Sequence, residues 1–236
     1  MFRFIHLLLT NFSNQLFPTL CLGCSQSLKS RESILCISCR INLPETGQHR
    51  EPYDQDLLNK FAGKVPIRFI ASYLYFKKGG IVQKLIHHIK YKGQKEAAKE
   101  LANWYGNQLM AECEHTSNID LIIAVPLHTD RFKQRGYNQS EWIAMGLADA
   151  LQIPIYNNVL FRNRFEESQT HKNRLERWEN VMSVFSVKNP ELIRGKNVML
   201  VDDVLTTGAT LESCATELLK FDCMSISILT LAVAGS

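Results

Sequence analysis

The sequence predicts an α/β protein in which a parallel β-sheet is flanked by helices. Two observations carry this prediction. Nearly continuous apolar runs begin at Ile119 and at Val198, and strands that are buried on both faces of a parallel sheet have this composition. Each run leads through a short loop into a segment with helical periodicity, which is the order of a β–α unit.

The remaining elements follow from the same two kinds of pattern. Alternating or continuous apolar residues predict strands, and a period near 3.6 residues predicts helices. The expected strands are 67–76, 119–126, 181–187, 198–201 and 226–233, and the expected helices are 81–89, 94–110, 136–151 and 209–221.

The chain length allows one full domain and a small module, since the sequence has 236 residues. Prolines and glycines gather between residues 42 and 66 with charges of both signs, which is typical of a connecting segment. We therefore expect an N-terminal helix and cysteine module over 1–45, a linker over 46–66 and the α/β domain over 67–236.

The composition is that of a globular protein, with 45% hydrophobic and 21% charged residues. A formal net charge of +4 permits a phosphate-bearing ligand or nucleic acid but requires neither. The apolar N-terminus has no small-residue cleavage site, and no run approaches the roughly 20 apolar residues of a membrane span. We expect a packing helix, with membrane contact as the alternative, in a cytoplasmic protein. Its apolar face comprises Phe4, Leu7, Leu8, Phe12, Leu16 and Phe17.

Two Cys-x-x-Cys pairs near the N-terminus indicate a metal site. Cys21 and Cys24 form one pair, and Cys36 and Cys39 form the other. Each pair can present two thiolates to one ion, so that the two pairs complete a tetrahedral Cys₄ site for Zn²⁺. Two disulfides or an iron–sulfur cluster are the alternatives; a reducing compartment disfavours the former, and the regular spacing disfavours the latter. Four protein ligands leave no open position for substrate, so the zinc would be structural or serve partner binding.

The stretch 198–210 carries the chemistry that we expect to be central. Asp202 and Asp203 follow an apolar strand, where their carboxylates can accept hydrogen bonds from sugar hydroxyls or hold a divalent cation. A helix begins just after them, and its first turn leaves backbone N–H groups free for a phosphate. The residues expected to bind that phosphate are Thr206, Thr207, Gly208, Ala209 and Thr210.

Adjacent carboxylates after an apolar strand also occur in Walker B segments. Those require a Gly-x-x-x-x-Gly-Lys-[Ser/Thr] loop, and in the nearest candidate, Gly23 to Ser30, Leu28 replaces the second glycine. A plain core strand with a capped helix is the remaining alternative. The whole of 198–210 resembles the phosphoribosyl pyrophosphate (PRPP) signature of type I phosphoribosyltransferases.

A second strand–loop–helix unit is basic. The loop 127–135 lies between the strand 119–126 and a helix, and it can offer fork-shaped guanidinium donors to a pyrophosphate. Its candidate residues are Leu127, His128, Arg131 and Arg135.

A long polar segment, 164–177, carries charges of both signs. Its length favours a mobile lid that closes over a phosphorylated substrate, and a solvated loop is the alternative.

The combination of motifs resembles the ComF family of phosphoribosyltransferase-like proteins. The motifs occur in one order along the chain: the two cysteine pairs, 89–93 (IKYKG), 125–127 with 135–139, 168–170 with Arg177 and Asn180, and the acid pair. The resemblance implies a type I phosphoribosyltransferase fold preceded by a small, zinc-ribbon-like module. It also implies PRPP with Mg²⁺ at the acid pair, which holds the ion through ribose or water, and a lid that includes Arg164, Gln169, Thr170, Arg174 and Arg177.

Three functions remain open from the sequence. The first is Mg²⁺-dependent transfer of a phosphoribosyl group to an acceptor that the sequence does not identify, with release of pyrophosphate. The second is non-catalytic binding of PRPP or another ribose-5-phosphate ligand. The third is nucleic-acid binding, single-stranded DNA included, through the cysteine pairs and the lysine-rich segment 77–99. The resemblance associates the second and third functions with an accessory role in DNA uptake, where a competence helicase would be a partner. An N-terminal glutaminase domain, which glutamine-dependent amidotransferases carry, is not recognisable.

Overall fold

The computed structural model describes residues 18–51, 55–163 and 184–234. The expected N-terminal helix face, Phe4 to Phe17, lies outside these residues. So does the whole expected lid, including Arg164, Gln169, Thr170, Arg174 and Arg177. Within the described part, no helix is long and apolar enough to cross a membrane.

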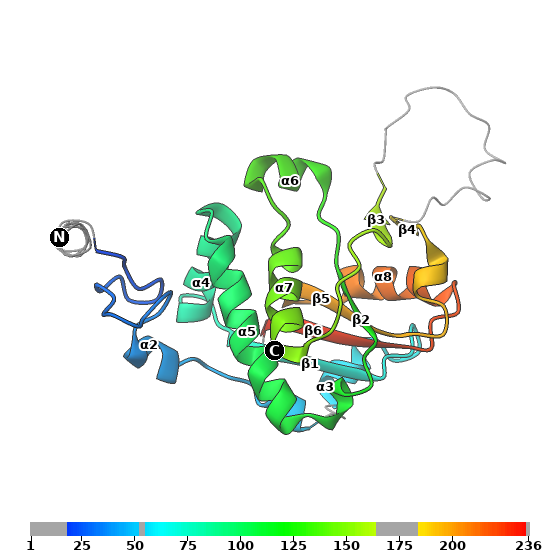
Figure 1. Cartoon of the computed structure of the whole chain (residues 1–236), viewed down its shortest axis with the longest axis horizontal. Coiled ribbons are helices and arrows are strands. Elements are labelled where there is room, and N and C mark those ends of the chain that lie inside the picture. Colours follow the sequence, from blue (N-terminus) through cyan, green and yellow to red (C-terminus); the bar gives the residue numbers. More distant parts are fainter. Residues whose placement is uncertain (1–17, 52–54, 164–183, 235–236) are drawn as a thin grey trace, which may run out of the picture.

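The centre of the protein is a four-stranded parallel sheet. Its strands are β1 (Phe69–Phe76), β2 (Leu121–Ala124), β5 (Asn197–Leu205) and β6 (Ser225–Ala234). They lie in the order β1-β6-β5-β2, and every pair is parallel. An isolated parallel bridge from Ile122 to Ile155 extends the sheet beyond β2. The predicted α/β class with a parallel sheet is confirmed (Figure 1).

Helices cover both faces of this sheet. The helices α4 (Ile81–Tyr91), α5 (Lys95–Glu112) and α7 (Gln139–Leu151) lie on one face, and α3 (Gln55–Asn59) and α8 (Ala209–Leu219) lie on the other. Successive side chains of β5 alternate between them: Met199 joins the core beneath α5 and α7, whereas Leu200 joins the core beneath α8. A strand that is buried on both faces needs apolar residues at both parities, which explains the continuous apolar run from Val198.

A close helix crossing fixes the position of α7. A Cβ atom on Gly146 would lie 2.0 Å from the Lys99 carbonyl oxygen and 2.9 Å from the Asn103 backbone nitrogen, both in α5. On α5, a Cβ at Gly106 would lie 2.6 Å from the Ala150 Cβ. The two backbones approach this closely because both positions lack a side chain. The N-terminal end of α7 is thereby held at the carboxyl edge of the sheet.

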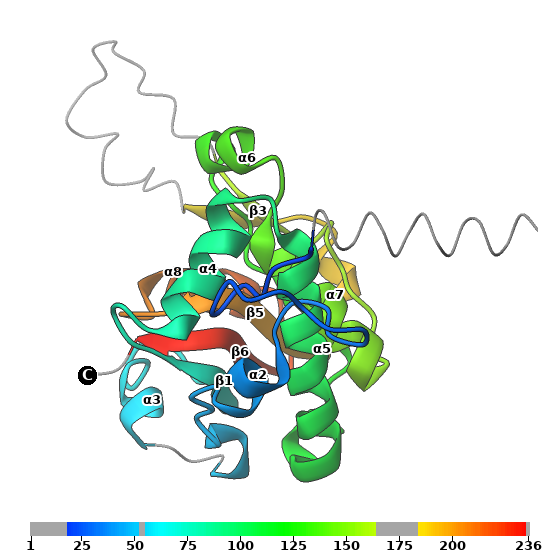
Figure 2. The same cartoon turned by 90° about the vertical axis from the view of Figure 1, so that its left-hand side faces the viewer.

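The cysteine module packs against α4 and α5 (Figure 2). It includes the short helix α2 (Ile37–Ile41). A Cβ on Gly23 would lie 2.6 Å from the Ile81 Cδ1 atom, and the Lys84 ammonium donates to the Gly23 carbonyl at 3.3 Å. The Arg40 guanidinium lies 4.0 Å from the centre of the Trp104 ring, in cation–π geometry. The module therefore touches the α/β domain through both apolar and charged contacts.

The segment 46–66, expected as a linker, is packed against the domain where it is described. Tyr75 N–H donates to the Pro44 carbonyl and Thr46 N–H donates to the Tyr73 carbonyl, so the chain pairs with the free edge of β1. Further along, Phe61 and Val65 are buried in the core beneath α8. The prolines and glycines masked the apolar spacing of this segment, and an edge strand that is covered in this way offers fewer unpaired backbone groups.

The remaining elements are short. A two-stranded antiparallel unit joins β3 (Leu160–Arg162) to β4 (Phe185–Val187), outside the main sheet. The 3₁₀ turns are η1 (Gln48–Arg50), η2 (Glu114–Thr116) and η3 (Pro190–Leu192).

The basic segment 127–135 was expected to be a loop, and this was wrong for most of its length. It contains the helix α6 (Thr129–Arg135). The His128 Nδ1 atom accepts from Asp130 N–H at 3.3 Å and caps the helix, and Gly136 ends it with a φ of 77°. A glycine stop is a local signal for a helix end, whereas histidine is not among the preferred N-cap residues, so the start of this helix had no clear sequence signal.

Candidate functional site

The strand β5 presents the acid pair, Asp202 and Asp203, near the carboxyl end of the sheet. Their side chains point to opposite faces, as adjacent strand residues do. Asp203 has a side chain that is only 8% exposed, whereas Asp202 is half-buried. Their environments therefore differ although they are neighbours.

Asp203 is held by two helices. The Lys90 ammonium, at the end of α4, lies 2.9 Å from each of its carboxylate oxygens. The Gln139 amide, in the first turn of α7, donates to Oδ2 at 2.7 Å. Gln139 is itself buried, with 4% of its surface exposed. Asp203 thus joins β5 to α4 and α7 in a polar cluster.

Asp202, unlike Asp203, has no charged partner among the described residues. Its Oδ1 atom accepts from the Ser140 hydroxyl at 2.8 Å and from the backbone N–H of Asp203 at 2.8 Å. Burial, and then the negative charge of Asp203, raise the pKa of Asp202 to about 7. Desolvation disfavours the charged form of a carboxyl group, and a like charge nearby adds to this. Hydroxyl donors or a cation would relieve both effects.

The loop after the acid pair surrounds a small hollow. Gly208 adopts a φ of 84°, which favours glycine, and caps α8. A Cβ on Gly208 would also lie 3.0 Å from the Phe61 ring. The Thr207 hydroxyl accepts from Ala209 N–H at 3.4 Å. Asp202 and the residues 204–211 line a hollow of about 40 Å³ here. All five residues expected to bind phosphate, Thr206 to Thr210, lie on this hollow.

Larger hollows of about 530, 710 and 880 Å³ lie elsewhere on the protein. The chemistry of the side chains, and not the size of the hollow, distinguishes the site.

The segment 127–135 contacts the C-terminal end of α4. Within the segment expected to bind pyrophosphate, Leu127 and His128 are half-buried and Arg131 is exposed on α6. The Arg135 guanidinium lies 5.2 Å from the centre of the Tyr91 ring. Its Nε and Nη1 atoms are buried and have no hydrogen-bond partner among the described residues.

The connection from α6 to α7 reaches the end of α4 as well. The Tyr137 hydroxyl donates to the carbonyl of Ile89, the residue before Lys90. The Asn138 side chain caps α7 by accepting from Ser140 N–H at 3.1 Å, and it donates to the Val125 carbonyl at 3.0 Å. Burial raises the pKa of Tyr137, so the hydroxyl stays a donor. The sequence motifs around Lys90 and Gln139 therefore meet at the acid pair.

Sequence reasoning missed three site residues: Lys90, Gln139 and Ser140. The segments that contain them, 89–93 and 135–140, stood out as motifs, but no role followed from spacing. A lysine separated by 113 residues from its carboxylate partner has no local sequence signal.

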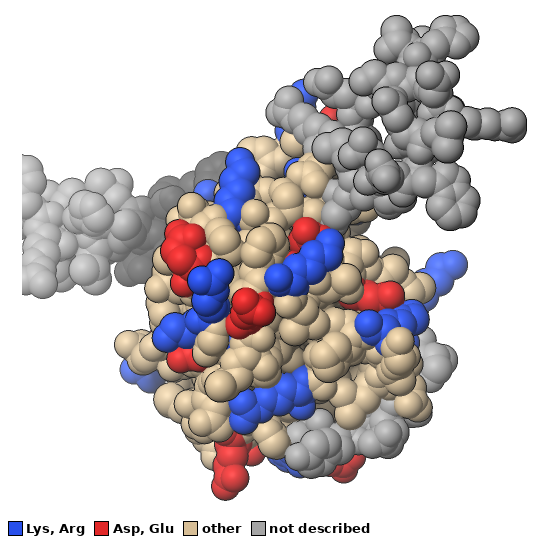
Figure 3. Space-filling view, turned by 90° about the vertical axis from the view of Figure 1, so that its right-hand side faces the viewer, with Lys and Arg blue, Asp and Glu red and all other residues tan. Residues whose placement is uncertain are grey.

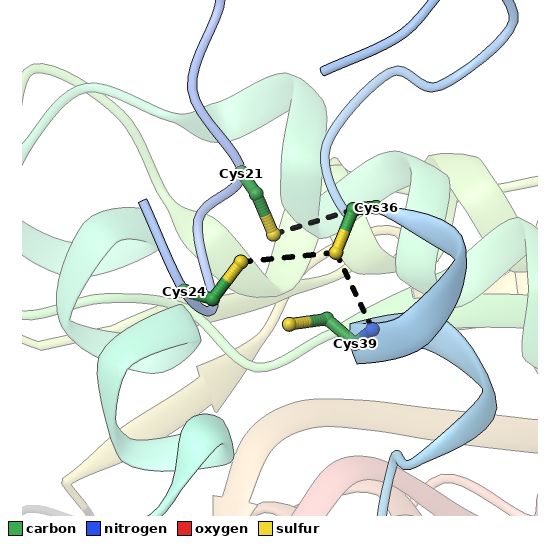
Figure 4. Close-up of side chains that lie close together, drawn as sticks. All are labelled: Cys21, Cys24, Cys36 and Cys39. Atoms are coloured by element: carbon green, nitrogen blue, oxygen red, sulfur yellow. Dashed lines mark hydrogen bonds between the residues drawn. The ribbon is translucent and has the colours of Figure 1, made fainter. Parts of the chain in front are cut away.

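The four cysteines form a second site, at the N-terminal module. Their sulfur atoms lie within 4.8 Å of one another, and Figure 4 shows all four side chains converging from the 21–24 loop and the start of α2. A tetrahedral zinc ion with bonds of about 2.3 Å separates its sulfur ligands by about 3.8 Å, and the Cys24 and Cys36 sulfurs are 3.7 Å apart. The donor set and its spacing therefore fit a Zn²⁺ ion.

The protonation of this cluster is uneven without metal. Burial opposes ionisation of Cys21, but backbone N–H groups, that of Cys36 foremost, lower its pKa to about 6. Burial and the neighbouring thiols raise the pKa of Cys39. A metal ion binds thiolates, so loading the site releases protons.

Charges of both signs are interspersed on the face of the molecule shown in Figure 3. Among the described residues of that face, neither sign of charge forms a broad surface of the kind that binds nucleic acid through phosphates.

The fold and the site define the class of protein. A parallel sheet flanked by helices, with an acid pair leading into a threonine- and glycine-containing cradle, is the arrangement of a phosphoribosyltransferase-like domain. Residues 138–236 match the family described as "Phosphoribosyl transferase domain". The match includes Gln139, Ser140, the acid pair and the cradle.

The curated relatives narrow the class. The chain is 36% identical to "Competence protein F" of Haemophilus influenzae over 118 residues, which cover 49% of this chain and 51% of that one. It is 35% identical to "Competence protein ComFC" of Bacillus subtilis over 47% of this chain and 43% of that one. It is 29% identical to "DNA utilization protein YhgH" of Salmonella typhi over 61% of this chain and 63% of that one. The chain thus spans less than two thirds of the length of these relatives. Together with the domain match, they support a ComF-family, phosphoribosyltransferase-like protein, as the motifs predicted.

Two solved structures are also similar. One is the allosteric regulatory enzyme of purine biosynthesis, with 22% identity and a TM-score of 0.41 over 56% of this chain and 26% of that one. The other is a purine phosphoribosyltransferase from Pyrococcus horikoshii, with 21% identity and a TM-score of 0.37 over 58% and 73%.

Proposed function

We propose that this protein binds PRPP with Mg²⁺ and transfers its phosphoribosyl group to an acceptor. One observation carries the proposal: an acid pair and a phosphate cradle stand on one strand–loop–helix unit, with Asp202 on the cradle itself. The acid pair suits the ribose hydroxyls, and the first turn of α8 suits the 5′-phosphate. The alternation of side chains along β5 and the left-handed backbone of Gly208 support this arrangement of the acid pair and the first turn of α8.

The reaction proposed is a displacement at the anomeric carbon. The acceptor forms a bond to this carbon as the bond to the pyrophosphate oxygen breaks, and positive charge builds up on the ribose. The acid pair would orient the ribose and stabilise this charge. Asp202 and Asp203 would hold the Mg²⁺ ion through ribose or water, and the ion, when bound, neutralises the leaving pyrophosphate.

The pyrophosphate would lie against the 127–135 segment. Arg135 supports this assignment best, because its buried Nε and Nη1 atoms have no partner in the described part of the chain. Leu127, His128 and Arg131 would complete this side of the site. The lid residues Arg164, Gln169, Thr170, Arg174 and Arg177, which the structure does not describe, would close over the ligand.

A second candidate is an accessory role in DNA uptake, either as a PRPP-binding protein without turnover or as a binder of single-stranded DNA. The names of the relatives, "Competence protein F" and "DNA utilization protein YhgH", favour it. A competence helicase would be a partner for such a factor. With either function, the cysteine cluster would hold structural Zn²⁺. Such a site needs reduced cysteines, which suits the cytoplasm.

Titration calorimetry followed by an assay of pyrophosphate release separates these functions. Saturable binding of PRPP in the presence of Mg²⁺, with release of pyrophosphate on addition of an acceptor, supports the transferase. Binding without release for any of a panel of nucleobases and amines supports the non-catalytic role. Absence of PRPP binding would contradict both.

Single-stranded DNA binding needs its own measurement. The double substitution Lys77→Ala/Lys78→Ala removes two exposed positive charges from the lysine-rich segment. If the segment contacts phosphates, these changes should weaken binding and reduce its dependence on salt concentration. Unchanged affinity and salt dependence would exclude these two lysines from a DNA interface.

A further inference from the structure

We propose that the cysteine module controls ligand affinity: metal binding at its four cysteines fixes the helix α4, and α4 carries Lys90 to the acid pair. This inference deepens the proposed function and rests on it. It gives a role in ligand binding to the N-terminal module, which lies outside the matched domain of residues 138–236.

The first support is that the module and α4 share one core. Cys21, Ile34 and Leu35 of the module are buried in the same apolar cluster as the inner face of α4. That face comprises Val82, Leu85, Ile86 and Ile89. Cys21 is also one of the four cysteines whose sulfur atoms converge. The module thus contributes to the core that α4 covers.

The second support is a direct contact between the metal-binding loop 21–24 and the first turn of α4. A Cβ atom on Gly23 would lie 2.6 Å from the Ile81 Cδ1 atom and 3.0 Å from the Cys39 sulfur. The Lys84 ammonium, one turn further along α4, donates to the Gly23 carbonyl at 3.3 Å. Two of the four sulfur atoms flank Gly23 in the chain, so a metal ion that holds these sulfurs also holds the backbone that α4 contacts.

The third support is the position of Lys90 at the other end of the same helix. Lys90 lies about 14 Å from Ile81 along the helix axis, and its ammonium lies 2.9 Å from each carboxylate oxygen of Asp203. The Tyr137 hydroxyl donates to the Ile89 carbonyl at this end. A helix is a rigid element that can carry a displacement from one end to the other. A shift of α4 at the module would therefore move the ammonium relative to the acid pair.

The physical consequence is a reciprocal coupling between metal and ligand. Without metal, the loop 21–24 loses the ion that would fix it, and fewer molecules hold Lys90 beside Asp203. The apparent affinity for PRPP falls with the fraction of molecules that are competent to bind. By linkage, PRPP must then tighten metal binding by the same factor, and such couplings are typically about 5- to 150-fold.

The experiment is a competition for Zn²⁺ between the protein and a chromogenic chelator, with and without saturating Mg²⁺–PRPP and with excess Mg²⁺ throughout. A chelator solution without protein corrects for zinc that PRPP itself binds. In wild type, PRPP should tighten zinc binding by at least about fivefold. Ile81→Ala removes the side chain that Gly23 contacts; it should still bind both ligands, but with a factor below about twofold. Ile41→Ala truncates a module isoleucine that is 77% exposed, and this matched control should keep the wild-type factor.

The converse titration measures the same coupling. Removal of zinc in the presence of a thiol reductant should weaken PRPP binding to wild type by the same factor, read by calorimetry. A zinc affinity that PRPP does not change would overturn the inference and leave the proposed function standing. So would a factor in Ile81→Ala equal to that of wild type.

Failure of the proposed function has a different signature, because wild type then does not bind PRPP at all. Hydrogen–deuterium exchange still tests the link between the module and Lys90 in that case. Zinc removal should speed exchange in the last turn of α4, residues 88–91, and more in wild type than in Ile81→Ala. Unchanged exchange in this turn would overturn the inference independently of PRPP.

Discussion

Arg135 provides the sharpest prediction about the pyrophosphate side of the site. The Nε and Nη1 atoms of its guanidinium are buried and have no partner within the described ranges, and its ring partner is Tyr91 at 5.2 Å. Buried donors without partners destabilise the free protein, and they can donate hydrogen bonds to pyrophosphate in the complex. The substitution Arg135→Met keeps the aliphatic stem and removes the donors.

The substitution should raise the stability of the free protein and lower its affinity for the ligand. Each unpaired buried donor costs about 1–3 kcal/mol, so removal of two donors should gain about 2 kcal/mol. Loss of the cation–π contact should cost about 1 kcal/mol. The net gain of about 1 kcal/mol corresponds to a rise in Tm of about 2–4 °C. One lost charge-assisted hydrogen bond to pyrophosphate is worth about 1.5–3 kcal/mol, which is a loss of affinity of about 10- to 100-fold.

Calorimetry with Mg²⁺–PRPP and thermal unfolding without ligand measure the two quantities. Lys133→Met is the matched control, because it removes an exposed charge from the same helix. Wild-type affinity in Arg135→Met would refute the assignment of Arg135 to the pyrophosphate. A fall in Tm of several degrees would show that the guanidinium already has a partner in the free protein.

Three further predictions concern stability and the metal. Cys36→Ser should release the bound zinc, detected with a chromogenic chelator, and expose the module to protease while the α/β domain keeps its circular dichroism spectrum; an unchanged metal content would contradict the Cys₄ site. Gly146→Ala should destabilise the protein by about 1–3 kcal/mol in urea, because the new Cβ would lie 2.0 Å from the Lys99 carbonyl oxygen; an unchanged urea midpoint would contradict the close crossing of α5 and α7. The Arg50 guanidinium, and then His49, lower the pKa of Glu112 from 4.5 to about 2. Stability from this group is therefore present above pH 4.5 and lost as the pH falls towards 2, so Glu112→Gln should flatten the acid limb of a stability–pH profile, and a parallel profile would exclude the contact.

The sequence was sufficient for the parts of the fold that depend on local pattern. The apolar run from Val198 predicted a strand buried on both faces, and the pattern that follows it predicted the helix that begins at Ala209. The two cysteine pairs predicted a cluster whose geometry fits zinc. Each of these features is contained within a few residues of chain.

The contacts across the fold could not be predicted in this way. Lys90, Gln139 and Ser140 reach the acid pair only because the C-terminal end of α4 and the N-terminal end of α7 lie beside the same edge of the sheet. The close approach of α7 to α5 depends on Gly106 and Gly146. An isolated glycine in a helical pattern does not indicate which helix it will contact. Nothing local distinguishes Lys90 from the other lysines of the segment 77–99.

Composition was a poor guide to packing in two segments. The abundance of proline and glycine between residues 46 and 66 predicted a linker, and within this segment Phe61 and Val65 are part of the core. The basic composition of 127–135 suggested a loop, although His128 caps a helix there. In both segments, the overall amino-acid composition suggested irregular structure and hid the spacing of the residues that pack or form a helix.

The most direct test of the account is calorimetric titration of Mg²⁺–PRPP into wild type and into Asp202→Asn. Asp202 is the member of the acid pair that lines the cradle, and its described contacts are few, so the substitution should leave the fold intact. The account predicts saturable binding, one ligand per chain, to wild type and none to Asp202→Asn at the same concentrations. Equal affinity for the two proteins would contradict it.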